Sequence, residues 1–206
     1  MSSTTIDRSS SRPKHKKQTV PVTTVIHAEV VGSERFRPHL QRITLQSDEF
    51  AGWITNVPDQ FITFIFPRKD RKQPAVERDF TWDKWDQMPA DEQPSASNYT
   101  VRYWYPERNE VVVDMVLHEG SSAGCDWARA SEPGDKLAIW GPRVAFDPPA
   151  DTEWLLLFGD DTALPGIGVI LETLPVHRRA TVIVEVDSEA DQVPFPTNER
   201  IDVQWL

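Results

Sequence analysis

The stretch WLLLFGDDTALPGI, residues 154–167, decides the fold of this chain. Five consecutive apolar residues, 154–158, are typical of a strand that is buried on both faces. Apolar residues then recur at helical spacing and predict a helix over residues 162–174. A strand, an acidic turn that carries a threonine, and a helix therefore follow one another directly.

The acidic turn GDDT, residues 159–162, has two interpretations that the sequence leaves open. Ligands in open α/β sheets bind where strand ends meet helix starts, so the turn is a candidate nucleotide-type site. The alternative is a simple helix cap, in which Asp160 or Asp161 accepts hydrogen bonds from the free N–H groups of the helix.

The residues ahead of this unit predict an antiparallel β domain. Segments that are rich in β-branched and aromatic residues and bounded by turn formers predict strands. These segments are residues 22–31, 40–47, 60–67, 98–106, 110–118 and 132–142. We expect the six strands to close into a small β-barrel.

The other segments complete the predicted organisation. Residues 68–97 are rich in proline and charge but also carry two tryptophans, which predicts an ordered excursion, and residues 121–130 predict a short helix. Further strands at 181–186 and 201–206 follow the helix of 162–174, as in a parallel α/β sheet. The predicted fold class is therefore β plus α/β. We expect a disordered basic tail at 1–20, a six-stranded antiparallel β-barrel domain at 21–147 and a short, truncated α/β domain at 148–206.

Composition excludes several classes of function. The net charge of −10 disfavours nucleic acid as a partner, because a phosphate backbone needs a clustered positive surface. A single cysteine and five scattered histidines predict no disulfide and no metal site. The sequence shows no apolar signal core and no bilayer-length apolar run, so we expect a cytoplasmic protein without membrane insertion.

Three segments carry a resemblance to a known family: SNYTVRYW (97–104), DMVLHEGSSAGCDWARASEPGDKLAIWGPR (114–143) and WLLLFGDDTALPGIGVILETLP (154–175). The chain resembles the siderophore-interacting protein family of FAD-dependent ferric-siderophore reductases, which are ferredoxin-reductase-like. The resemblance implies that FAD binds between the two domains and takes hydride from NAD(P)H. It also implies a ferric siderophore as partner, whose iron is released when Fe(III) is reduced to Fe(II).

The resemblance also implies a set of FAD-binding residues. They are Tyr99, Thr100, Val101, Arg102, Asp114, Leu117, His118, Ser122, Gly124, Cys125 and Thr162. An aromatic strand residue can pack on an isoalloxazine ring, and the N–H groups at a helix start can receive a pyrophosphate. Strand alternation lets only one of Tyr99 and Thr100 face the flavin. For Tyr99 the alternative is a place in the core, and for Cys125 we expect a buried, inert thiol.

Positive charge is needed where an anionic ferric chelate binds to such an acidic protein. Arg102 and Arg143 are the candidate substrate-binding residues, and Lys69, Arg71 and Lys72 are weighed as an extension of the same lining. The alternative for each is ordinary solvated surface charge. We assign no residue a catalytic role.

Three departures from the family pattern favour a second hypothesis. Ser97 stands where an arginine for the FAD phosphate is usual, Thr63 stands near a usual siderophore lysine, and the chain stops at Leu206 after three predicted α/β strands. The alternative function is therefore a diverged, non-catalytic binding or regulatory module, with a homodimer that compensates for the short second domain.

Overall fold

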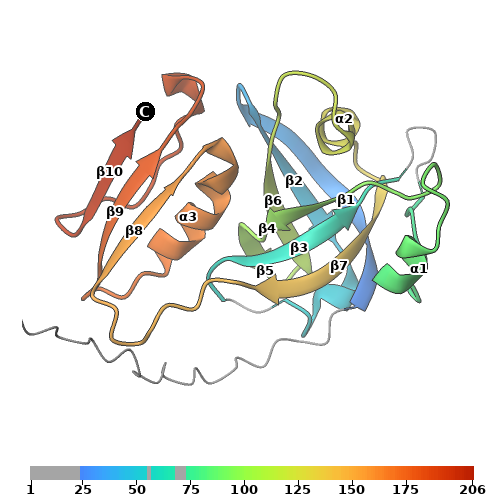
Figure 1. Ribbon diagram of the computed structural model, residues 1–206, viewed down its shortest axis with the longest axis horizontal. Helices are drawn as coiled ribbons and strands as arrows, with labels where there is room; N and C mark the ends of the chain where they lie inside the picture. Colours follow the sequence, from blue (N-terminus) through green and yellow to red (C-terminus); the bar gives the residue numbers. More distant parts are fainter. Residues whose placement is uncertain (1–23, 55–56, 68–72) are drawn as a thin grey trace, which may run out of the picture.

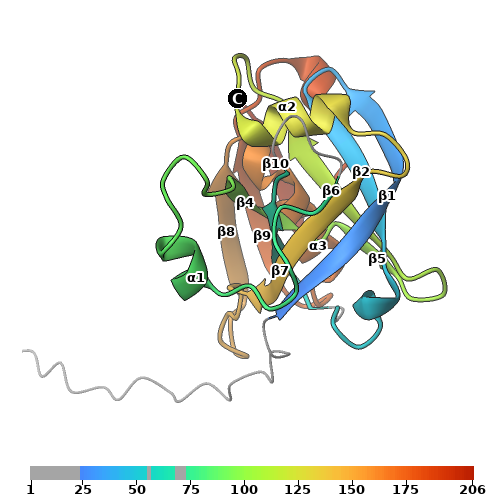
Figure 2. The same cartoon turned by 90° about the vertical axis from the view of Figure 1, so that its right-hand side faces the viewer.

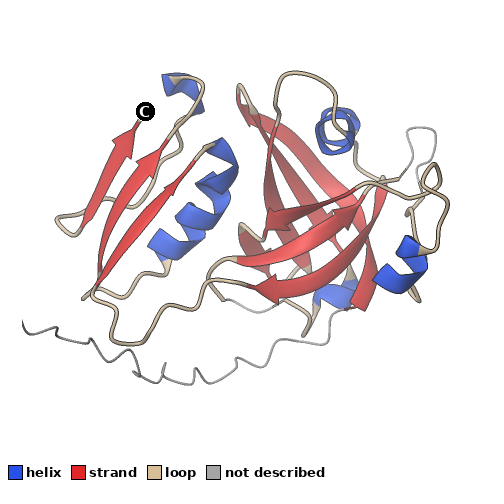
Figure 3. Cartoon of the chain, viewed as in Figure 1, coloured by secondary structure: helices blue, strands red, loops and turns tan. Residues whose placement is uncertain are grey.

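The computed structural model describes residues 24–54, 57–67 and 73–206. Strands dominate the chain, and they form one curved antiparallel sheet and one smaller parallel sheet (Figures 1 and 3). The strands of the curved sheet are β1 (Thr24–Arg37), β2 (Leu40–Gln46), β3 (Gln60–Ile65), β4 (Ala96–Thr100), β5 (Tyr103–Tyr105), β6 (Glu110–Val116) and β7 (Lys136–Val144). The predicted fold class is confirmed.

The expected six-stranded closed barrel needs correction. The curved sheet has seven strands in the order β4-β3-β7-β1-β2-β6-β5, and no ladder among the described residues closes it into a barrel. The expected strand at 98–106 is divided because its backbone changes partner. The N–H of Val101 donates to Gln60 O at 2.8 Å, whereas the N–H of Arg102 donates to Val112 O at 2.8 Å. The chain bends at this point from the β3 side to the β6 side.

The curved sheet encloses the main hydrophobic core, which includes Ile43, Phe64, Val113 and Ile139, all fully buried. The helix α2 (Ala123–Ala130) packs over one end of this core through Cys125 and Ala128 (Figure 2). The sequence predicted a short helix in this segment, and the structure confirms it.

The tryptophan-rich excursion packs against the outer face of the curved sheet. It contains the helix α1 (Trp82–Asp86), and Trp82 meets Trp140 of β7 edge to face at 5.5 Å between ring centroids. Val76 and Phe80 complete this separate cluster. The part at residues 73–95 is therefore ordered by burial of its aromatic side chains.

The second sheet is parallel, in the order β10-β9-β8. Its elements are β8 (Trp154–Gly159), α3 (Leu164–Glu172), β9 (Arg179–Val184) and β10 (Ile201–Trp205). A 3-10 turn at Asp161–Ala163 precedes α3, so the predicted helix begins in a tighter form.

The helix α3 lies between the two sheets (Figure 1). Its apolar residues share one hydrophobic cluster with β8, β9 and β10, and also with Leu40 of β2, Phe36 of β1 and Val116 of β6. The two sheets are thus joined by packing as well as by the chain. None of the helices in the described residues is long and apolar enough to cross a bilayer. The predicted tail at 1–20 and residues Lys69, Arg71 and Lys72 lie outside the described residues.

Candidate functional site

The centre of the candidate site is the approach of Tyr99 to the start of α2. A Cβ atom added at Gly124 would lie 2.5 Å from the Tyr99 hydroxyl oxygen, so only glycine leaves room there. The Phe64 ring packs against the Tyr99 ring, with 4.8 Å between the ring centroids. Burial raises the pKa of Tyr99 to about 12, so the phenol keeps its proton at neutral pH.

The helix start itself is arranged by a cap. Ser122 accepts a hydrogen bond from the N–H of Cys125 at 3.2 Å, which satisfies one of the free donors of the first turn. Cys125 is buried, and its thiol lies 3.5 Å from Val116 O. The expectation of a buried thiol agrees with this placement.

Thr100 points to the opposite side of β4 from Tyr99, as alternation requires. Its hydroxyl is hydrogen-bonded to Asp59, and burial raises the pKa of that carboxyl. A Cβ added at Gly166 of α3 would lie 3.0 Å from Asp59 and 3.6 Å from the Thr100 hydroxyl. Thr100 therefore lies where the curved sheet meets the helix of the second sheet.

His118 and the acidic turn form a second meeting point of the two sheets. Asp160 accepts hydrogen bonds from the N–H of Thr162 at 3.0 Å and from its hydroxyl at 2.5 Å. The bond to Thr162 lowers the pKa of Asp160, whereas burial raises the pKa of Asp161, and the His118 imidazole acts to lower both. Asp160 therefore caps this turn, as the capping interpretation of the sequence GDDT predicted.

The predicted residues do not all converge. Among the described residues, no hydrogen bond, ion pair or ring contact joins Tyr99 to Thr162, whose side chain is exposed. Val101 and Leu117 lie in the main core. Asp114 is buried and holds Arg42 in a two-pronged ion pair at 2.7 and 2.8 Å.

The Arg102 side chain is paired within the protein and is not free to bind a ligand. Its guanidinium donates to both carboxylate oxygens of Glu172 on α3, at 2.5 and 2.7 Å, and its side chain is only 9% exposed. It also stacks over the Tyr103 ring at 4.2 Å. The structure therefore gives Arg102 the role of joining the bend of the curved sheet to α3.

Arg143 lies in a groove of about 730 Å³ between the curved sheet and the tryptophan excursion. One nitrogen donates to Thr63 at 2.8 Å and to Asn98 at 2.6 Å, and the guanidinium lies 4.5 Å from the centroid of the Phe61 ring. Its Nε is buried without a hydrogen-bond partner, and burial lowers its pKa. No carboxylate among the described residues forms an ion pair with it, so its charge is available to an anion.

Sequence reasoning missed three residues at the junction of the sheets. Asp59 adopts a positive φ of 55°, which aspartate tolerates, and the turn former before β3 was the available signal. Glu172 and Asp191 gave no local signal, because their partners Arg102 and His39 are distant in sequence. Among the described residues, no group of three or more potential metal ligands is arranged around one point.

Comparison with known proteins gives the family. Residues 29–146 match the model of the siderophore-interacting FAD-binding domain, and residues 152–206 match that of the siderophore-interacting protein. The chain belongs to the siderophore-interacting protein family. The Tyr99, Gly124 and Arg143 arrangements all lie in the FAD-binding part of this siderophore-interacting protein.

Characterised relatives are longer than this siderophore-interacting chain. Ferric vibriobactin reductase ViuB of Vibrio cholerae is 30% identical over 175 residues, which cover 82% of this chain and 61% of the relative. The NADPH-dependent ferric-chelate reductase of Escherichia coli is 29% identical over 183 residues, covering 86% of this chain and 69% of the relative. The chain spans less than two thirds of the length of several curated relatives it matches.

Solved structures support the same fold. The siderophore-interacting protein SipS from Aeromonas hydrophila superposes with a TM-score of 0.74 at 26% identity, covering 90% of this chain and 68% of that chain. A siderophore utilization protein from T. fusca gives the same TM-score and identity, with 89% and 69% coverage. A ferredoxin reductase of carbazole 1,9a-dioxygenase, at 15% identity and a TM-score of 0.62, shares the fold.

Proposed function

We propose that this chain is a flavin-dependent ferric-siderophore reductase that takes electrons from NAD(P)H and reduces Fe(III) to Fe(II) in an anionic chelate. The family assignment and the names of the two reductase relatives support the proposal. Reduction of an imported chelate inside the cell suits the cytoplasm, where we propose that the protein works.

The observation that carries the proposal is the cradle formed by Tyr99 and Gly124. Gly124 lets the Tyr99 ring approach the capped start of an eight-residue helix, so N–H groups of the type that bind phosphate lie near an aromatic ring that can pack against a flavin. The residues present therefore fit an FAD. When bound, FAD supplies the redox chemistry that these side chains lack, since it accepts a hydride and gives up electrons one at a time.

The protein's own residues would bind and orient the cofactor. Tyr99 and the start of α2 would hold the cofactor through ring packing and backbone N–H groups, and the Tyr99 phenol is protonated. Thr100 and Asp59, which are hydrogen-bonded to each other, would bound the cofactor on the side of α3.

Arg143 would receive the chelate. Its half-buried, incompletely satisfied guanidinium contacts Thr63, which stands near the place where the family pattern has a lysine. A cation is therefore still present at this point of the groove, although a different strand supplies it. An anionic chelate would complete the hydrogen bonding of Arg143 and balance its charge.

The experiment that tests the function is a visible absorption spectrum of the protein after incubation with FAD and removal of free cofactor. Anaerobic NADPH and then a ferric siderophore are added in turn. We expect retained flavin that bleaches with NADPH and recovers its colour with the chelate. Protein that retains no flavin even at high FAD concentrations would overturn the reductase proposal.

The second candidate function is a diverged binding or regulatory module, and Ser97 favours it, because the usual charged anchor for the FAD phosphate is missing. The two candidates differ in one further measurement, the binding of a ferric chelate to flavin-free protein. Chelate binding with no flavin retention would establish the second candidate and exclude the first.

The role of Arg143 has its own test. We expect Arg143→Gln to weaken ferric-chelate binding about tenfold or more, because a charge-assisted contact is lost, while FAD binding is unchanged. Titration of tryptophan fluorescence with the chelate measures this, since Trp82 and Trp140 line the same groove. Arg35→Gln, which removes an exposed arginine elsewhere, is the control. Equal chelate affinity in both variants would remove Arg143 from the site.

A further inference from the structure

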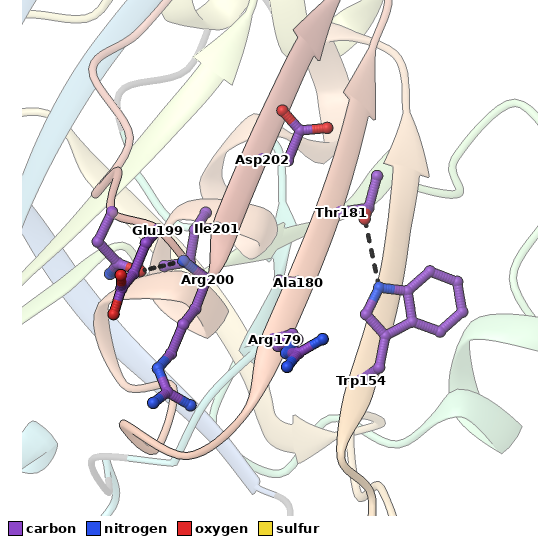
Figure 4. Close-up of a pocket in the computed structure, with 9 residues that line it drawn as sticks. Trp154, Arg179, Ala180, Thr181, Glu199, Arg200, Ile201 and Asp202 are labelled. Atoms are coloured by element: carbon purple, nitrogen blue, oxygen red, sulfur yellow. Dashed lines mark hydrogen bonds between the residues drawn. The ribbon is translucent and has the colours of Figure 1, made fainter.

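A second cavity, the junction cavity, lies where the two sheets meet and is separate from the Arg143 groove. It holds about 350 Å³, and residues of β1, β2, β5 and β6 line one side of it, while α3 and residues 193–195 line the other. The groove around Trp154 in Figure 4 lies on the opposite face of the second sheet, because the next residue along β8, Leu155, packs in the cluster with α3. The junction cavity is therefore internal to the contact between the sheets.

The walls of the junction cavity are mostly apolar and aromatic. Phe36 and Tyr103 contribute rings from the curved sheet, and Phe195 contributes a third ring from the segment before β10. Leu164 of α3 and Val193 add aliphatic surface. Small-molecule sites commonly combine such walls with a few polar groups, and aromatic walls favour a ligand with a planar apolar body.

The charged residues of the junction cavity leave an excess of one positive charge. Arg102 is paired with Glu172, and Arg42 is paired with Asp114. Arg37 is the remaining charged residue of the lining, and no carboxylate among the described residues forms an ion pair with it. In a chain of net charge −10, an unpaired arginine in a cavity gives a local positive potential that attracts an anion.

The hydrogen bonds of Arg37 and Arg42 show which N–H groups remain for a ligand. Arg37 donates from Nε to Gln192 O at 3.0 Å and from Nη1 to Phe36 O at 2.9 Å. Arg42 donates to the Asp114 carboxylate from Nε and Nη2. Nη2 of Arg37 and Nη1 of Arg42 therefore have no partner in the described part of the chain. Both guanidinium groups lie over the Phe36 ring, at 5.9 and 4.5 Å from its centroid.

We propose that the junction cavity binds a small aromatic carboxylate, with its carboxylate on Arg37 and Arg42 and its ring against the aromatic walls. A carboxylate supplies the negative charge and the acceptor oxygens that these N–H groups lack, and charge-assisted hydrogen bonds of this kind are strong. A phosphate monoester suits the cavity less well, because its charge of nearly −2 exceeds the single positive charge of the lining.

Such a ligand would contact both sheets at once. The curved sheet supplies the two arginines, and α3 and residues 193–195 supply the facing wall. Binding would therefore stabilise the present arrangement of the two sheets, since a ligand favours the state that holds its complete site. The proposal is independent of the reductase function, because neither Arg143 nor the Tyr99–Gly124 cradle contributes to the lining.

An NMR titration of the full chain with 2-naphthoate tests the proposal. We expect the amide signals of residues 36–42, Tyr103, Leu164 and 193–195 to shift together, with a dissociation constant of about 0.1–1 mM for a probe of this size. The neutral analogue 2-naphthamide should bind about tenfold more weakly, because it cannot balance the positive charge. No saturable shift at these residues, shifts confined to the Arg143 groove, or equal affinity for the two probes would overturn the proposal.

Two arginine variants test the charged contact. Arg37→Gln should weaken 2-naphthoate binding about tenfold, because a charge-assisted contact is lost, while the glutamine amide can still donate to Gln192 O. Arg179→Gln is the matched control, since Arg179 also has no ion-pair partner among the described residues but lies in the groove of Figure 4. It should leave the affinity unchanged. Equal affinity in the two variants would overturn the proposal, and circular dichroism of each variant checks that the fold is kept.

Discussion

At the scale of single residues, Gly124 shows how a side chain that is absent can define a site. Any substituent there would meet the Tyr99 hydroxyl, while Phe66 closes the other side at 3.4 Å from the same added Cβ. The distance between the start of α2 and the Tyr99 ring therefore depends on residue 124 having no side chain. Two predictions belong to this scale.

Gly124→Ala should lower the free energy of unfolding by about 1–3 kcal/mol, because an added methyl overpacks a tight contact. Tyr99→Phe removes the hydroxyl that the methyl would meet, so the double variant Gly124→Ala/Tyr99→Phe should recover most of that loss. Urea denaturation of the four proteins measures the coupling. Strictly additive losses in the double variant would mean that the clash with the Tyr99 hydroxyl is not the cause.

Ser97→Arg should tighten FAD binding about tenfold or more, since residue 97 lies on the same face of β4 as Tyr99 and an arginine there adds a charge-assisted contact to phosphate. Isothermal titration with FAD at low and high salt measures the gain, which salt should reduce. Ser97→Gln has a long side chain without charge and serves as the control. Equal FAD affinity in the two variants would show that charge at this position is irrelevant.

At the scale of elements, the bend between β4 and β5 and the helix α3 hold each other through Arg102 and Glu172. The guanidinium is almost fully covered, it stacks on Tyr103, and it also lies 4.0 Å from Asp114. The backbone at the bend has no continuous hydrogen-bond ladder to one partner strand. The ion pair between Arg102 and Glu172 connects the bend to the second sheet. We therefore expect the loss of a carboxylate to cost more unfolding free energy at Glu172 than at an exposed ion pair.

Glu172→Gln should cost about 1–2 kcal/mol of unfolding free energy, because Arg102 keeps its charge in a covered position with a weaker partner. Glu107→Gln breaks an exposed pair with Arg108, both of whose side chains are about half exposed, and should cost less than about 0.5 kcal/mol. Chemical denaturation of both variants under one buffer condition gives the comparison. Matching costs would show that the Arg102 pair contributes no more than a surface contact.

The same elements show what sequence can and cannot predict. Strands such as β2 and β6 followed from apolar and β-branched residues, because those patterns reflect burial directly. The break at Val101 and Arg102 did not, because it depends on which strands the backbone meets on either side. Arg102 and Arg143 carry the same prediction as ligand-binding cations, and the sequence cannot separate them, because the pairing of Arg102 with a glutamate on α3 is a long-range event.

At the scale of the whole molecule, His39 and Asp191 add a polar contact between the two sheets. Asp191 is buried and accepts from the N–H of His39 at 2.9 Å, from its ring nitrogen at 3.0 Å and from Ser188 at 2.7 Å. The hydrogen bond to Asp191 raises the pKa of His39. Burial acts to raise the pKa of Asp191, but the hydrogen bonds from Ser188 and His39 outweigh it and lower that pKa.

This contact makes stability depend on pH with a definite sign. A raised histidine pKa gives stabilisation that is fully present below about pH 6.5 and is lost as the pH rises through the folded value. We therefore expect His39→Gln to lose more melting temperature at pH 6 than at pH 8, as measured by calorimetry. Asp161 and Asp187 also face His39 and act in the same direction. An equal loss at both pH values would contradict a charged His39.

The shared hydrophobic cluster around α3 has a consequence for how the molecule is made. Leu40 and Phe36 precede α3 in the chain and therefore leave the ribosome before it, and they form part of the surface on which Leu164 and Ile167 later pack. During synthesis, the curved sheet can therefore be complete before α3 emerges, and the helix finds a finished template. Translation order and packing order coincide, so a circular permutant that begins at residue 148 should fold more slowly and lose more material to aggregation than the natural chain.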